Sequence, residues 1–175
     1  MECALHSTVG MKPDSDLQKT VMDALALDPH VDVLVRFYEA YPVAHTRWMP
    51  GALEALDAAG SLPLALITNK ARTVTLAVLD ALGVRHRFAC VYAGGDGPLK
   101  PDPSPVVSCA RALGVEVGSL WVVGDGTQDV GAARAAGAFA VAVLGGFSSA
   151  EKLEAAKPDL LLSSMSELAG RLRAR

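Results

Sequence analysis

The stretch formed by residues 120–136, LWVVGDGTQDVGAARAA, most narrows the folds that this chain can adopt. Its first four residues are apolar and indicate a short buried strand. Two glycines flank Asp125, where they permit a tight turn, and a helix of small residues follows. Asp125 and Asp129 therefore stand at the carboxyl end of a strand, where ligands bind in open α/β sheets. Two carboxylates there suit Mg²⁺; the alternative is that Asp129 caps the helix and Asp125 is a turn residue.

The same succession of strand and helix recurs from Gly51 to the end of the chain. Apolar strands are predicted at 64–67, 88–93, 120–123, 140–144 and 160–162, and helices at 51–59, 72–82, 104–113, from 127, at 149–156 and from 166. Because these strands are continuously apolar, the sequence predicts an α/β fold for residues 46–175, with a Rossmann-like, mostly parallel sheet covered by helices on both faces.

Residues 1–45 follow a different pattern. Apolar residues share one helical face at 17–25 and again at 31–38, and Asp28-Pro29 interrupts the pattern between them. Two short helices joined in this way predict a helix hairpin rather than a complete domain. The segment 42–50 is predicted to link this hairpin to the main body.

The composition excludes several classes of function. A net charge of −3 gives no basic surface for nucleic acid, and no apolar run approaches the ~20 residues that span a membrane. Cys3, Cys90 and Cys109 have no metal-ligand spacing, and the last two fall on apolar elements, which favours core thiols. The sequence therefore predicts a cytoplasmic protein without nucleic-acid or membrane partners.

Polar residues also follow two other predicted elements: Thr68 and Asn69 end the strand at 64–67, and Lys100 lies in the loop 94–103. Taken singly, Thr68 and Asn69 could cap the next helix, and Lys100 could be a solvated lysine. Together with Asp125 and Asp129, however, these residues form a coherent phosphate site. Mg²⁺ held by the two aspartates and the Lys100 ammonium would neutralise the phosphoryl oxygens, and the Thr68 hydroxyl would donate a hydrogen bond to them.

These residues stand in three motifs, LALITNK with Thr68, LKPDP with Lys100 and GDGTQDVGAARAAG with Asp125 and Asp129. On them, residues 50–175 resemble the haloacid dehalogenase-like hydrolase superfamily, most closely its phosphoglycolate-phosphatase-like branch. In the last motif Gly126 replaces the usual Ser. Residues 1–45 resemble the end of that branch's helical cap domain.

The resemblance implies a Mg²⁺-dependent phosphatase that acts on a small phosphorylated metabolite. Thr68, Asn69 and Lys100 would hold phosphate, and Asp125 and Asp129 would hold Mg²⁺.

The motif that supplies the family's nucleophile, DxDGT at the end of the first strand, has no counterpart in these residues. Asp14-Ser15-Asp16 lacks a buried strand before it and a Gly-Thr after it, so we interpret both aspartates as helix-start residues. No catalytic residue is therefore assigned. Two alternatives stand beside the phosphatase: a non-catalytic relic that binds phosphate, metal or another protein, and a truncated fragment of a full-length phosphatase.

In the family that first strand is central, between the strands that carry Thr68 and Asp125. Its absence would leave two inner edges with unpaired backbone groups. Three outcomes are open: the two strands pair with each other directly, another chain fills the gap between them, or the sheet rearranges. We therefore expect an incomplete sheet and a homodimer or strand-exchanged oligomer.

Overall fold

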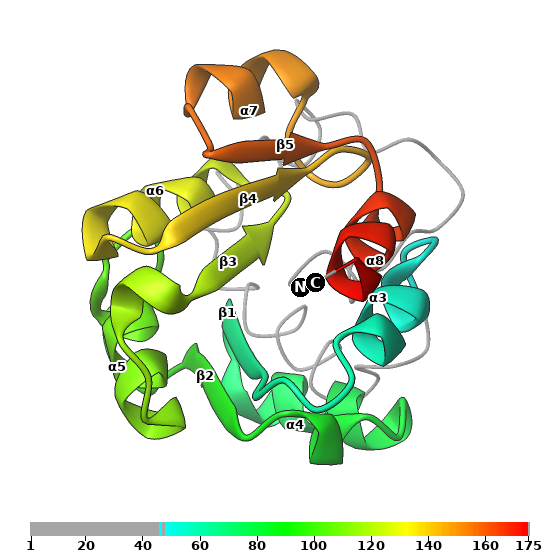
Figure 1. Ribbon diagram of the computed structural model, residues 1–175. Helices are drawn as coiled ribbons and strands as arrows, with labels where there is room; N and C mark the ends of the chain where they lie inside the picture. Colours follow the sequence, from blue (N-terminus) through cyan, green and yellow to red (C-terminus); the bar gives the residue numbers. More distant parts are fainter. Residues whose placement is uncertain (1–45, 47, 175) are drawn as a thin grey trace, which may run out of the picture.

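The computed structural model describes residue 46 and residues 48–174 (Figure 1). The predicted helix hairpin at 1–45, with Asp14 and Asp16, lies outside the described residues. The elements follow in the order α3 (Ala52–Ala58), β1 (Ala65–Ala71), α4 (Arg72–Ala81), β2 (Cys90–Gly94), α5 (Ser104–Leu113), β3 (Trp121–Gly124), α6 (Thr127–Ala136), β4 (Phe139–Val143), α7 (Ala150–Ala155), β5 (Leu160–Leu162) and α8 (Met165–Arg173).

Each strand and helix that the sequence predicts from Gly51 onward is present, so the α/β alternation is confirmed. The largest differences are at two strand boundaries. β1 continues to Ala71 rather than ending at Ile67. β2 begins at Cys90 rather than Phe88, because a turn of 3₁₀-helix at Arg85–Arg87 delays the strand.

Every strand pairing in this part of the chain is parallel, as predicted, and the described strands form two sheets. β1 pairs with β2, and β4 lies between β3 and β5. Among the described residues β1 and β3 do not pair with one another, and no described strand stands between them. Of the three outcomes left open for the strands that carry Thr68 and Asp125, direct pairing of these strands is not formed among residues 46 and 48–174.

Helices cover both faces of the larger sheet, and β4 shows why. Its successive side chains alternate between two buried clusters, as the pleat of a strand requires. Val141 and Val143 belong to the cluster formed with α3 and α8. Ala140 and Ala142 belong to the cluster formed with α5, α6 and α7. Both faces of β4 are thus buried, which explains why its sequence is continuously apolar. β3 and β5 pair with it on either side.

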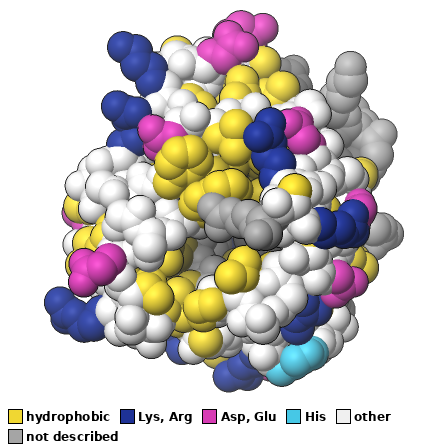
Figure 2. Space-filling view, viewed as in Figure 1, with side chains coloured by type: hydrophobic (Ala, Val, Ile, Leu, Met, Phe, Trp, Pro, Cys, Tyr) yellow, Lys and Arg dark blue, Asp and Glu magenta, His cyan; other side chains and the backbone are white. Residues whose placement is uncertain are grey.

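Apolar side chains gather around the centre of the face viewed in Figure 2. A hollow of about 320 Å³ is lined by residues of α3, α8, β3 and the segment before β1, including Leu56, Leu62 and Trp121. No helix in the described ranges is long and apolar enough to cross a membrane.

Candidate functional site

The carboxyl end of β1 is irregular, and the irregularity contains Thr68 and Asn69. β1 and β2 pair in register from Ala65 to Ile67, and the register shifts before Ala71 meets Gly94. A Cβ on Gly94 would lie 2.8 Å from the Asn69 carbonyl oxygen, so the close approach of the two backbones requires glycine. Bulges of this kind redirect side chains at sheet edges. Here the bulge turns the end of β1 toward the loop that carries Lys100.

Asn69 fixes the backbone of Lys100. Its amide nitrogen donates to the Lys100 carbonyl oxygen at 2.9 Å, and its amide oxygen accepts the Lys100 N–H at 2.9 Å. This two-way contact joins residues far apart in sequence and orients the lysine side chain. Asn69, predicted from the sequence to bind phosphate, is thus placed where it positions Lys100.

The Lys100 side chain joins strand β1 to helix α6. Its Nζ donates to the Ile67 carbonyl oxygen of β1 at 3.0 Å and to Asp129 Oδ1 of α6 at 2.5 Å. Lys100 is 5% exposed and Asp129 is 3% exposed, so this ion pair is buried. The interpretation of Lys100 as a solvated surface lysine is therefore wrong.

Asp125 lies in the turn after β3, and Asp129 lies in the first turn of α6. Asp125 is 2% exposed, and its Oδ2 accepts the Phe147 N–H at 2.5 Å. A Cβ on Gly124 would lie 2.3 Å from the Asp129 carboxyl carbon, so the glycine lets Asp129 reach back against the strand end. Phe147 was not predicted as part of the site, because a backbone N–H leaves no mark in the sequence.

The alternative that the polar residues cap helices is wrong for Thr68 and Asn69 and confirmed for Asp129. α4 has Ala71 at its N-cap and no side-chain cap, so Thr68 and Asn69 do not cap it. Thr68 is buried, and its Oγ1 accepts the Lys70 N–H at 3.1 Å. Asp129 does cap α6, since its Oδ2 accepts the Gly126 N–H at 2.9 Å. Its other oxygen binds Lys100, so the structural role and the charge-pairing role coexist.

Asp102, in the same loop as Lys100, faces another way. Its carboxylate accepts the Ser104 N–H at 2.7 Å at the start of α5. Hydrogen bonds from the Ser104 side chain and backbone hold the pKa of Asp102 below its ordinary value. The two charged residues of the motif LKPDP therefore have different roles: Lys100 belongs to the candidate site, and Asp102 accepts a hydrogen bond from the first residue of α5.

The described residues offer Mg²⁺ two carboxylates at this place, and no cluster of three or more His, Cys, Asp or Glu side chains occurs among them. Two carboxylates fit Mg²⁺, which is typically bound by one or two carboxylates, with water and phosphate oxygens completing its octahedron. Asp125 fits best, because within the described ranges its side chain accepts one N–H and pairs with no cation. Asp129 already contacts Lys100 and Gly126.

Beside this arrangement lies a small cavity of about 150 Å³. Its walls include Ile67, Lys100, Asp129 and the apolar side chains of β3. Residues of β1 and β3 line it, and Thr68 and Asp125 belong to or directly follow these strands without being among the lining residues. The structure thus joins three of the five predicted residues, Asn69, Lys100 and Asp129, by hydrogen bonds into one group that spans β1 and α6. Thr68 is the residue before Asn69 in β1, and Asp125 follows β3.

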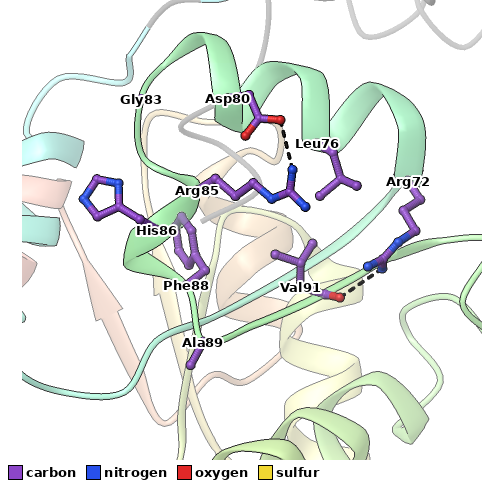
Figure 3. A pocket seen from close by; sticks show the side chains of 9 residues that line it. All are labelled: Arg72, Leu76, Asp80, Gly83, Arg85, His86, Phe88, Ala89 and Val91. Atoms are coloured by element: carbon purple, nitrogen blue, oxygen red, sulfur yellow. Dashed lines mark hydrogen bonds and ion pairs between the residues drawn. The ribbon is translucent and has the colours of Figure 1, made fainter.

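A larger hollow of about 610 Å³ lies elsewhere, against α4 and the start of β2 (Figure 3). Its charged side chains already contact other groups: Arg85 donates to Asp80 at 3.0 Å and Arg72 to the Val91 carbonyl oxygen at 3.2 Å. None of the predicted site residues lines it. We therefore place the candidate site at the strand ends and not in this hollow.

Comparison with known proteins agrees with the motifs. A family model described as haloacid dehalogenase-like hydrolase matches residues 8–137. A phosphoglycolate phosphatase from Chromobacterium violaceum is 37% identical over 137 residues, which are 77% of this chain and 60% of that protein. A phosphoglycolate phosphatase from Escherichia coli O157:H7 is 30% identical over 171 residues, covering 94% of this chain and 65% of the relative. The chain thus spans less than two thirds of the length of these relatives.

Solved structures show the same fold. The crystal structure of a predicted phosphoglycolate phosphatase from Haemophilus somnus 129PT superposes with a TM-score of 0.71 at 27% identity, covering 77% of this chain and 61% of that one. A hydrolase of subfamily IA from Geobacter sulfurreducens PCA superposes with a TM-score of 0.64 over 92% of this chain and 74% of that one; at 21% identity this likeness concerns the fold alone.

Proposed function

The chain belongs to the haloacid dehalogenase-like hydrolase family, and we propose that it binds a small phosphorylated metabolite together with Mg²⁺ at the carboxyl ends of β1 and β3. The observation that carries this proposal is the buried group of Lys100, Asp125 and Asp129, each 5% exposed or less. Three ionisable side chains buried at strand ends are costly for stability alone, and strand ends are where α/β sheets bind ligands.

The charges of this group determine how phosphate would bind. Lys100 carries one positive charge, and the two aspartates carry two negative charges, so the group is negative as a whole. A phosphate dianion would be repelled by it, and the effect is strong where water is excluded. A bound Mg²⁺ would make the summed charge of the group positive. We therefore propose that phosphate binding depends on Mg²⁺ at Asp125, with Asp129 beside it.

The remaining residues would position the phosphate. Lys100 supplies a point charge between the two sheets, and Asn69 holds its backbone in place. Thr68 supplies a hydroxyl at the point where the irregular half of β1 begins. Mg²⁺ would supply the charge that makes phosphorus open to attack. Phosphoglycolate, the substrate in the name of the relatives, is the compound we propose to test first.

Hydrolysis also needs a group that attacks phosphorus. Within the described residues the site holds Asp125 and Asp129 and no third acidic side chain joined to them. The second candidate function is Mg²⁺-dependent phosphate binding without turnover, which uses the same binding residues and needs no attacking group. The two functions share the binding site and differ only in the nucleophile.

Turnover separates the two functions. We expect phosphate release from a panel of small phosphate esters, phosphoglycolate included, to be Mg²⁺-dependent and to be lost in Asp125→Asn. Arg85→Met, an exposed residue of the other hollow, serves as the control and should leave the rate unchanged. Mg²⁺-dependent binding without release would select the non-catalytic function. Release that survives in Asp125→Asn would contradict the proposed site.

We also propose that the protein is a homodimer or strand-exchanged oligomer. The hollow beside Leu56, Leu62 and Trp121 supports this, because its lining is mainly apolar and an apolar cleft can receive a segment of another chain. Sedimentation equilibrium should give twice the 18.2 kDa mass of the chain. A single species of monomer mass across the accessible concentration range would contradict the proposal.

A further inference from the structure

Two cysteines outside the phosphate site lie next to each other. Cys90 is the first residue of β2, and Cys109 lies in α5. Their sulfur atoms are 3.6 Å apart, and both are free thiols. They are 19 positions apart in the chain, so the fold and not the local sequence brings them together.

The two thiols differ in access and in acidity. Cys90 is partly exposed, whereas Cys109 is 1% exposed. Burial, and secondly the nearby Cys90, raise the pKa of the Cys109 thiol to about 12. Because the thiolate is the reactive form, Cys109 is a poor target for a reagent from solution. Cys90 is therefore the thiol that an oxidant reaches first.

We propose that Cys90 and Cys109 form a reversible redox site that closes to an intramolecular disulfide when the protein meets a hydroperoxide. The Cys90 sulfur attacks one peroxide oxygen, the O–O bond breaks, and water or an alcohol leaves, so that Cys90 becomes a sulfenic acid. The Cys109 sulfur then attacks the Cys90 sulfur, and the S–O bond breaks. Hydroxide leaves and takes up the Cys109 proton as water. The thiols lose two electrons in total, and the peroxide accepts them.

The geometry fits this reaction. A disulfide needs a sulfur–sulfur distance of about 2.05 Å, so the sulfurs must approach by roughly 1.5 Å, within reach of side-chain rotation. β2 and α5 pack directly against one another, so the backbone already holds both residues close.

The bond would enclose the segment that carries Lys100, since this residue lies between the two cysteines in sequence. Cys109 also lines the 150 Å³ cavity that Lys100 and Asp129 line. Oxidation would thus restrain the loop from which the lysine enters the phosphate site. The redox site itself rests only on the two sulfurs and stands whether or not phosphate binds.

Hydrogen peroxide applied to the full chain carrying Cys3→Ser, which leaves only the pair, tests the inference. We expect both thiols to disappear together, with a mass loss of two hydrogen atoms and a Cys90–Cys109 cross-linked peptide, and dithiothreitol to restore them. In the same background Cys109→Ser should accumulate a sulfenic acid at Cys90 that dimedone traps. Cys90→Ser should leave Cys109 reduced at least about tenfold longer.

Circular dichroism before and after oxidation confirms that each variant stays folded. Two thiols that remain titratable in the folded protein under excess peroxide would overturn the inference. So would a cross-link found only between separate chains, or equal oxidation rates for Cys90→Ser and Cys109→Ser.

Discussion

Replacing Lys100 with methionine lowers the free energy of unfolding by about 3–5 kcal/mol, the usual cost of leaving one member of a buried ion pair without its partner. Methionine keeps most of the side-chain volume but removes the ammonium that contacts Asp129 Oδ1 at 2.5 Å. The Lys100 and Asp129 side chains are 2% and 4% exposed, so water does not replace the lost contact. Urea unfolding of the wild type and the variant measures the difference.

The double variant Lys100→Met with Asp129→Leu separates the charge effect from packing. Since no charge is left buried, we expect it to be more stable than Lys100→Met alone. Recovery should be incomplete, because Asp129 also accepts the Gly126 N–H. The matched control is Arg85→Met, which removes an ion pair with Asp80 that is 51% and 55% exposed and should cost under about 1 kcal/mol. Equal losses for Lys100→Met and Arg85→Met would contradict the buried pair.

The second large effect is expected at Gly124. Alanine there would place a Cβ 2.3 Å from the Asp129 carboxyl carbon and 2.4 Å from its Cβ, atoms held by α6. Relief requires the strand end and the helix to move apart, which should cost about 1–3 kcal/mol and weaken the contact between Asp129 and Lys100. Thermal unfolding measures the loss of stability, and phosphate titration measures the loss of binding.

Gly126→Ala is the matched control, only two positions away. A Cβ at Gly126 meets the end of the Gln128 side chain, which can rotate away, and the backbone there has an ordinary extended conformation. We therefore expect a change within about 0.5 kcal/mol. A Gly124→Ala variant as stable as Gly126→Ala would show that Asp129 does not need the close approach.

Much of the fold could be predicted from the sequence, because the buried strands consist of apolar residues and can be recognised by them. The apolar run AVAVL at 140–144 predicts a strand covered on both faces, and β4 is buried on both faces from Ala140 to Val143. Boundaries were harder where polar residues continue a strand. The end of β1, Thr68-Asn69-Lys70, is extended because it forms a bulge against Gly94, and this depends on a tertiary contact that no local pattern reports.

The division of the described strands into two sheets could not be predicted either. The sequence left three outcomes open for the strands that carry Thr68 and Asp125, and hydrogen bonding between distant strands decides among them. Local patterns place the strands and do not state their partners.

For the candidate site, the residue types in the sequence indicated which residues to consider, whereas the contacts that each residue makes depend on the fold. Lys100 and Asp129 could be predicted to serve one phosphate site, whereas their ion pair depends on the loop before α5 reaching α6. Asn69 was predicted to touch phosphate, and the structure places its amide on the backbone of Lys100. Backbone partners, Ile67 and Phe147, could not be found from side-chain types at all.

Calorimetric titration of the full chain with inorganic phosphate, with and without Mg²⁺, tests the central claim most directly. The negative sum of charges at Lys100, Asp125 and Asp129 predicts weak binding without the metal and binding at least about tenfold tighter with it. Asp125→Asn removes one negative charge, so it should bind phosphate better than the wild type when Mg²⁺ is absent and gain little from Mg²⁺. Phosphate affinity that is the same with and without Mg²⁺ in the wild type, or a Mg²⁺ effect that persists in Asp125→Asn, would contradict the account.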